Sequence, residues 1–117
     1  MKPEPFLDSR GIKYFKQIAG VLKARGMDKD EYSLELSMLA NEYVKYSDGA
    51  MQVTELGYYV TAKSGWQQVA PWVTLQKEAL STIGKLSPKF GLTPADFERI
   101  KSAVKAPEIK SDLELMM

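Results

Sequence analysis

The fold is decided by the stretch from Gly57 to Lys101, which reads GYYVTAKSGWQQVAPWVTLQKEALSTIGKLSPKFGLTPADFERIK. Its first part, residues 58–69, is rich in residues that favour strands and has a turn-forming sequence at its centre, so it predicts a short β-hairpin. Pro71 suits the first turn of a helix, and apolar residues then recur at helical spacing as far as Leu86. This part of the stretch therefore predicts a hairpin followed by a helix.

The end of the stretch predicts a second helix after a break. Pro88 would remove a hydrogen bond from a helix interior, so the preceding helix is expected to end just before it. Gly91 is expected to end the short turn that follows. Thr93, Pro94 and Asp96 then supply an N-cap, a first helical position and a first-turn carboxylate. A new helix is expected to begin there.

Two helices are predicted before this stretch. Ser9 is expected to cap the first, and Gly26 is expected to end it in a left-handed conformation. Asp28 is expected to cap the second, which continues to Leu56. Asp48-Gly49 marks the point at which a kink or break in this long helix is expected, since a glycine inside a helix is unfavourable.

The second helix carries the strongest periodic signal in the chain. Its aromatic and aliphatic residues are spaced alternately four and three apart, which is typical of a core stripe or of a subunit interface. A helix this long has more apolar length than so small a domain easily covers, and a neighbouring subunit would cover it. The residues assigned to core or oligomer interface are Tyr32, Leu36, Leu39, Tyr43 and Tyr46.

These elements predict a mainly α fold: a helical hairpin with a long central helix, a small β-hairpin and two C-terminal helices. The chain has 117 residues, which suits one domain with one modest core. The expected divisions are a flexible N-terminal arm over residues 1–8, a single helical domain over 9–106 and a mobile C-terminal tail over 107–117.

The composition excludes several kinds of chemistry. The chain has no cysteine and no histidine, which removes thiol catalysis, the usual general base and the commonest transition-metal ligands. It also has no Gly-rich phosphate loop. We therefore expect no enzyme activity, no metal and no cofactor. No apolar run is long enough to span a membrane and the N-terminus does not resemble a secretory signal, so a cytoplasmic location is expected.

Basic residues are concentrated in the first helix. The net charge is only +1, yet the segment from Arg10 to Arg25 holds five basic residues and no acid. Such a segment suits contacts with nucleic-acid phosphates, whereas the plainer interpretation is a solvated surface whose last cations complement the helix C-terminus. The DNA-binding candidates are Lys13, Lys16, Lys23 and Arg25. A second, weaker basic group consists of Lys85, Lys89, Arg99 and Lys101.

The predicted hairpin is the third candidate surface. It carries Lys63 between Tyr59 and Trp66, a combination that suits a DNA backbone or groove. Aromatic residues in a hairpin more often cover the edge of a core or meet a neighbouring subunit. The packing role is the favoured interpretation.

The order of these elements, together with Phe90-Gly91-Leu92-Thr93-Pro94, resembles the small subunit of phage DNA-packaging terminases. It departs from the usual pattern of that family at Pro88 and at Asp96-Phe97-Glu98. The resemblance implies a non-catalytic protein that recognises double-stranded viral DNA and assembles as a homo-oligomeric ring. It also implies a terminase large subunit as partner, which carries the ATPase and nuclease and is regulated by the small subunit in the host cell.

Two other functions fit the same residues. The first two helices would also suit a helix-turn-helix DNA-binding regulator of phage or plasmid origin. A helical adaptor without any nucleic-acid role is the second alternative. DNA binding at low salt separates the adaptor from the other two, and a ring as against a dimer separates the terminase subunit from the regulator.

Overall fold

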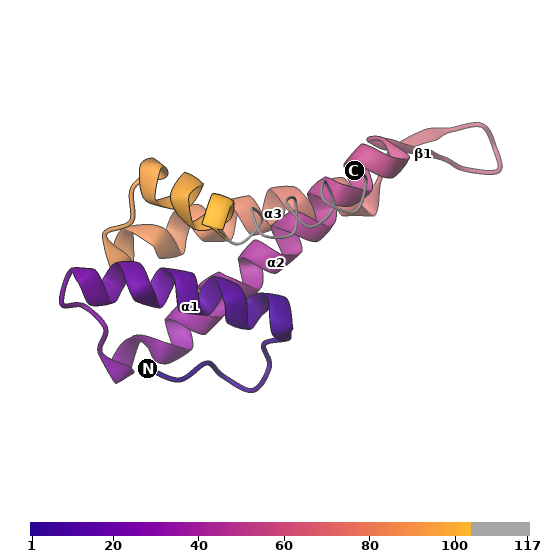
Figure 1. Cartoon of the computed structure of the whole chain (residues 1–117). Helices are drawn as coiled ribbons and strands as arrows, with labels where there is room; N and C mark the ends of the chain where they lie inside the picture. Colours follow the sequence, from indigo (N-terminus) through magenta and orange to yellow (C-terminus); the bar gives the residue numbers. More distant parts are fainter. Residues whose placement is uncertain (104–117) are drawn as a thin grey trace, which may run out of the picture.

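A computed structural model of the chain describes residues 1–103, which form a mainly helical fold (Figure 1). The predicted order of a helical pair, a small hairpin and two further helices is confirmed. The elements are α1 (Ser9–Ala24), α2 (Ser33–Leu56), β1 (Tyr59–Thr61), β2 (Gln67–Val69) and α3 (Pro71–Leu86), with 3₁₀ turns at η1 (Asp30–Tyr32) and η2 (Ser87–Phe90). Residues 94–103 form a last helix, called here the C-terminal helix. The predicted tail over 107–117 lies outside the described residues.

The N-terminus of α1 is capped one residue earlier than expected. The carboxylate of Asp8 accepts a hydrogen bond from the backbone N–H of Gly11 at 2.9 Å, whereas Ser9 is already the first helical residue. This hydrogen bond is the largest of the interactions that lower the pKa of Asp8 below its ordinary value. Leu7 is buried and lies over Gly11, where an added Cβ would be 2.8 Å from the Leu7 side chain. The N-cap at Asp8 is therefore found together with the burial of its neighbour Leu7.

The turn between α1 and α2 is partly as predicted. Gly26 has a φ of 71°, and the N–H of Met27 bonds to the carbonyl of Leu22 at 2.8 Å, which is the Schellman closure expected there. Asp28, however, is not a helix cap. The chain instead forms the η1 turn first, with Lys29 at its N-cap and no side-chain hydrogen bond.

The segment predicted as a flexible arm contacts the rest of the chain at several points. The amino group of Met1 pairs with Asp30 at 3.0 Å, the backbone N–H of Glu4 donates to the Ser37 hydroxyl at 3.0 Å, and Leu7 joins the core. Residues 1–8 are therefore held against the helical body at these points.

The long central helix is continuous, so the break expected at Asp48-Gly49 does not occur. Gly49 is buried where α2 meets α3. A Cβ built on it would lie 2.8 Å from the backbone carbonyl oxygen of Trp72 and 2.8 Å from Cβ of Gln76. The glycine thus allows close approach of two helix backbones, which is a common structural reason for a glycine inside a helix.

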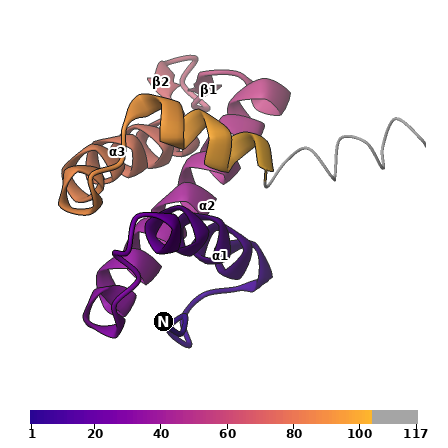
Figure 2. The same ribbon diagram turned by 60° about the vertical axis from the view of Figure 1, so that its left-hand side comes forward.

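The core of the chain is built by α1, α2 and the segment from α3 to the C-terminal helix. The C-terminal helix lies beside α1 in both Figure 1 and Figure 2. Tyr14 of α1 stacks on Tyr43 of α2 with ring centroids 5.2 Å apart, and Phe97 packs on the same Tyr43 ring at 5.7 Å. Tyr32 and Phe90 pack edge to face, with their ring centroids 6.0 Å apart.

The periodic residues of α2 are therefore core residues of the single chain. Leu36 and Leu39 have no exposed surface and Tyr43 is only 7% exposed, so these three pack mainly within their own chain. Tyr32 and Tyr46 are partly buried and pack against the same core. The core interpretation of the stripe is the one that fits this geometry.

The break before the C-terminal helix follows the prediction. Pro71 is the first residue of α3, and α3 gives way to the η2 turn that contains Pro88. Gly91 then adopts a φ of 65°. Both prolines occupy positions where no helical hydrogen bond from their nitrogen is needed.

The hairpin projects from the far end of the pair formed by α2 and α3 (Figure 1). Its strands are antiparallel, with Tyr59 opposite Val69. Trp72 anchors its base by donating from Nε1 to the carbonyl of Gly57 at 2.7 Å. Of the two packing roles expected for its aromatic residues, the cover of a core edge does not occur among the described residues, because Tyr59 and Trp66 are 61% and 70% exposed. The hairpin extends past the core formed by the described residues, and contact with a neighbouring subunit stays a prediction.

Candidate nucleic-acid interface

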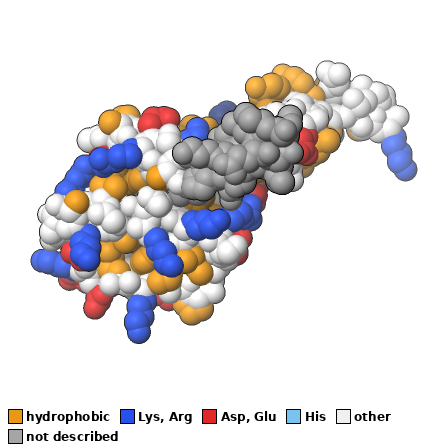
Figure 3. Space-filling view, in the orientation of Figure 1, with side chains coloured by type: hydrophobic (Ala, Val, Ile, Leu, Met, Phe, Trp, Pro, Cys, Tyr) orange, Lys and Arg blue, Asp and Glu red, His pale blue; other side chains and the backbone are white. Residues whose placement is uncertain are grey.

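One face of α1 is basic and free of acids. The helix buries Tyr14, Phe15, Ile18 and Leu22 and exposes Lys13, Lys16 and Lys23 on its other side. No aspartate or glutamate occurs between its ends. Lys and Arg side chains are spread over the molecular face on which α1 lies in front (Figure 3). These three lysines form the first part of the candidate interface.

A groove of about 460 Å³ runs between α1 and the C-terminal helix, beside the basic face. Its lining includes Lys16, Arg25 and Arg99, with Asp96 as the acidic residue among them. Gly20 lies in the same lining, and an added Cβ there would meet nothing within 4 Å. The absence of a side chain at Gly20 leaves the groove open along α1. The three lysines and this groove are called the basic face below.

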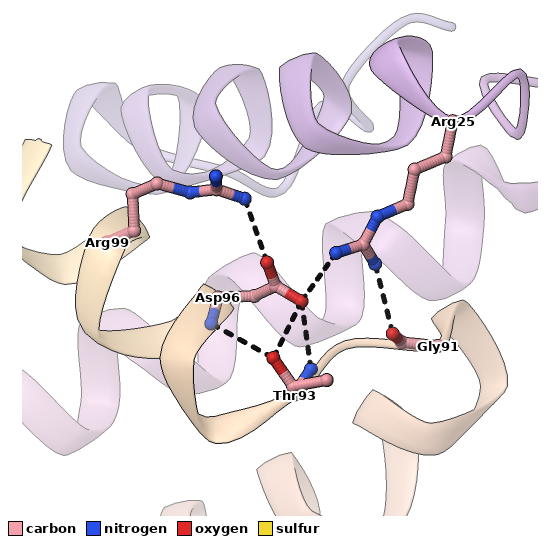
Figure 4. A network of polar contacts seen from close by, with 5 residues as sticks. All are labelled: Arg25, Gly91, Thr93, Asp96 and Arg99. Carbon is pink, nitrogen blue, oxygen red and sulfur yellow. Dashed lines mark hydrogen bonds and ion pairs between the residues drawn. The ribbon is translucent and has the colours of Figure 1, made fainter.

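Asp96 organises the end of the groove (Figure 4). Its Oδ2 accepts hydrogen bonds from the Thr93 backbone N–H and hydroxyl, both at 3.0 Å, and from Arg25 at 2.7 Å. Its Oδ1 accepts from Arg99 at 2.8 Å, while Arg25 also donates to the carbonyl of Gly91 at 3.0 Å. The backbone N–H of Asp96 in turn donates to the Thr93 hydroxyl at 3.3 Å, which makes a reciprocal capping box.

These contacts stabilise the ionised form of Asp96. The hydrogen bond from the Thr93 backbone, followed by that from Arg25, lowers the pKa of Asp96 to about 2. The side chain is almost fully buried, so the charge is held inside the structure by its donors. The network therefore ties the C-terminal end of α1 to the start of the C-terminal helix.

We expect Asp96→Asn to lower the melting temperature at pH 7 by roughly 5 °C, because one acceptor of the capping box and both arginine pairs are weakened. The wild-type carboxylate stabilises the fold at any pH above its unfolded pKa, near 3.8, and this contribution is lost as the pH falls towards about 2. Wild type should therefore lose stability more steeply than the variant between pH 4 and pH 2. Thermal unfolding followed by circular dichroism at a series of pH values measures both effects.

The matched control is Glu78→Gln, which removes an exposed carboxylate on α3. Its melting curve at pH 7 should stay close to that of wild type, since exposed carboxylates contribute little. Equal melting temperatures for Asp96→Asn and wild type would contradict the structural role of this network.

The structure separates the predicted DNA contacts into two kinds. The lysines at 13, 16 and 23 are exposed along α1, whereas Arg25 is engaged with Asp96 and Gly91. Arg99 of the second basic group also pairs with Asp96, but its side chain remains 64% exposed and reaches the groove. Arg25 therefore contributes first to the fold, and Arg99 joins the basic face.

The other basic residues are dispersed. Arg10 forms ion pairs with Asp8 and Asp48 and so connects the start of α1 to α2. Lys89 lies 3.7 Å from a carboxylate oxygen of Glu35, and Lys101 lines a different pocket. The second basic group does not form one surface in the described residues.

Sequence reasoning missed the part played by Asp96 and Arg99. The signal for Asp96 was present as Thr93 and an acid three residues later, which is a variant of the capping box. No local pattern indicated its partner, because Arg25 is separated from it by 71 positions along the chain. The groove was not predictable for the same reason.

Within residues 1–103, neither a metal-binding cluster nor a membrane-spanning helix is found. No group of three or more acidic residues in that range is arranged to hold a metal ion. No helix among the same residues is both long and apolar enough to cross a membrane.

Comparison with known proteins gives one result. A family model described as "Phage terminase, small subunit" matches residues 11–107. This range includes α1 from its third residue, α2, the hairpin, α3 and the C-terminal helix as far as it is described. Searches among curated proteins and among solved structures gave no significant match.

Proposed function

This chain belongs to the family of phage terminase small subunits, which act in phage DNA packaging, and from that premise we propose that it binds double-stranded viral DNA through the basic face. In this proposal the protein acts as a homo-oligomeric ring in the host cytoplasm. It brings the genome to the large terminase subunit and regulates that subunit, which carries the ATPase and nuclease. The family is generally the non-catalytic partner, so we place no catalytic step on this chain.

The observation that carries the DNA proposal is the combination of an acid-free helix face with an open groove. Lys13 and Lys16 lie on exposed turns of α1, and Lys16 also lines the groove that Arg99 enters from the C-terminal helix. Lysine and arginine side chains at this density favour phosphate contacts, which provide affinity and register without reading bases. The basic face is therefore suited to holding a DNA backbone.

The geometry does not favour a helix-turn-helix regulator. Such a motif joins its helices by a turn of about three or four residues and places the second helix in the major groove. Here residues 25–32 separate α1 from α2 and include the η1 turn. The second helix, α2, contributes Leu36 and Leu39 to the centre of the core. We therefore place the DNA on the first helix.

Binding of a labelled double-stranded DNA, measured by fluorescence anisotropy at several salt concentrations, tests the proposal. Each phosphate neutralised contributes about −0.9 to the slope of log K against log salt, so three lysines of one chain predict a slope of about −3 or steeper. No binding at about 50 mM salt, where phosphate contacts are strong, would instead support the helical adaptor.

A further inference from the structure

The hairpin is an apolar projection that the other described residues leave largely uncovered. Trp66, Tyr59 and Val69 are 70%, 61% and 57% exposed, and every strand residue except the partly buried Val60 is exposed. Lys63 is the only charged residue between positions 57 and 70. Three-residue strands joined as a lone ribbon are marginal in water, and exposed aromatic residues in a cluster mark protein interaction sites.

An apolar pocket of about 410 Å³ lies elsewhere on the same chain, between α2, α3 and the C-terminal helix. Tyr46, Leu80 and Phe97 are among its walls, and Leu80 is 55% exposed at its rim. Glu98 and Lys101 supply its charged lining. The pocket is large enough for one big aromatic side chain, and aromatic anchors in such pockets dominate many interfaces.

The two features do not meet within one chain. The hairpin extends beyond the end of α2, whereas the C-terminal helix that walls the pocket lies over the body of the molecule (Figure 1). The chain is elongated, with extents of 55 × 39 × 28 Å, so the projection and the pocket are available to different neighbours.

We propose that the hairpin of one copy inserts Trp66 into the pocket of a second copy, with Lys63 beside the neighbour's Glu98. The opposite charges of Lys63 and Glu98 favour the orientation in which Lys63 lies on the Glu98 side of the pocket and away from Lys101. A contact between two different surfaces of identical chains is head-to-tail, and it generates a ring when its rotation closes. The inference deepens the proposed ring by identifying the two surfaces that form it.

The oligomeric state of two single variants, one on each surface, tests the contact from both sides. Trp66→Ser removes the inserted ring, and Gly84→Phe fills the pocket from its wall, where an added Cβ meets nothing within 4 Å. Each variant should convert the assembled protein to monomers, or raise the concentration for half-assembly at least tenfold, in light scattering after gel filtration. Phe6→Ser and Ser81→Phe are the controls, because they make comparable changes, an exposed aromatic residue to serine and a small helix residue to phenylalanine, at exposed positions outside the hairpin and the pocket lining.

Engineered cysteines give a second test, because the chain has no cysteine of its own. The double variant Lys63→Cys with Glu98→Cys should form a ladder of covalent dimers, trimers and larger species under mild oxidation. A mixture of the two single variants should form only dimers that contain one chain of each kind. Dimers formed by Lys63→Cys alone, with no ladder from the double variant, would indicate that hairpins meet each other and would overturn the proposal.

The chain's own C-terminal segment is the competing occupant of the pocket. Its sequence contains Leu113, Leu115 and Met116, which are apolar enough to fill such a site. Changing these three together to serine in the full chain should leave assembly unchanged. If that variant loses assembly and Trp66→Ser does not, the proposed contact is wrong.

The outcomes separate this contact from the proposed function. Unaltered assembly of Trp66→Ser together with weaker DNA binding would make the hairpin a DNA contact and overturn the inference. A wild type that remains monomeric would overturn the inference and the ring together. In every case the salt dependence of DNA binding judges the packaging function independently.

Discussion

Changing Lys13, Lys16 and Lys23 together to glutamate should weaken binding to double-stranded DNA by about 10²- to 10³-fold at moderate salt. Each change removes a cation and places an anion near the phosphates, so the loss exceeds that of three neutral substitutions. The slope of log K against log salt should become shallower by about 3. Fluorescence anisotropy over a salt series measures both quantities, and circular dichroism verifies that the helix content is retained.

The matched control changes Lys2, Lys29 and Lys77 to glutamate. These lysines are exposed and lie outside α1 and its groove. Because three lysines become glutamates in both variants, the control has the same net charge as the test variant. We expect it to lose at most about tenfold in affinity, through the general field of the protein. Equal losses for the two triple variants would show that net charge, and not the basic face, governs DNA binding.

Gly49→Ala should destabilise the chain by about 2 kcal/mol, although alanine is the better helix former. An added Cβ would lie 2.8 Å from the Trp72 carbonyl oxygen and 3.1 Å from the Gln76 Cα, and both are backbone atoms. These atoms cannot rotate away as a side chain would, so α2 and α3 must separate. Chemical denaturation followed by circular dichroism measures the loss.

Gly20→Ala and Gly84→Ala are the controls for this prediction. Both glycines are helical, and an added Cβ at either position meets nothing within 4 Å. These changes should therefore raise the free energy of unfolding by about 0.5–1 kcal/mol, through helix propensity alone. A stabilising effect at all three positions would contradict the close contact at Gly49.

Much of the fold was predictable because its signals are local. Gly26 adopts the left-handed conformation expected of it, Gly91 ends the η2 turn as expected, and Pro71 opens α3. The error at Ser9 shows the limit of such signals, because Asp8 and Ser9 are adjacent and both are good N-caps. The burial of Leu7 accompanies the earlier cap, and this contact depends on the folded chain.

The candidate site was predictable only in part. The exposure of Lys13, Lys16 and Lys23 follows from the periodicity of α1, whose apolar residues must face the core. The involvement of Arg25 in a buried network does not follow from that pattern. The basic residues that flank Gly91 were expected to form a second, weaker group, yet only Arg99 among them reaches the groove.

The sequence by itself determined the order of the helices and turns and several of their ends, because caps, prolines and glycines act on neighbouring dihedral angles and the apolar period selects the buried face. Only the tertiary structure decided which distant elements meet: Asp96 with Arg25, Gly49 with the backbone of α3, and the hairpin with no part of its own core. Those outcomes depend on how helices cross and how far α2 extends past the others. The angles at which the helices cross and the length of α2 beyond the other helices arise from packing of the whole chain, which local dihedral preferences do not specify.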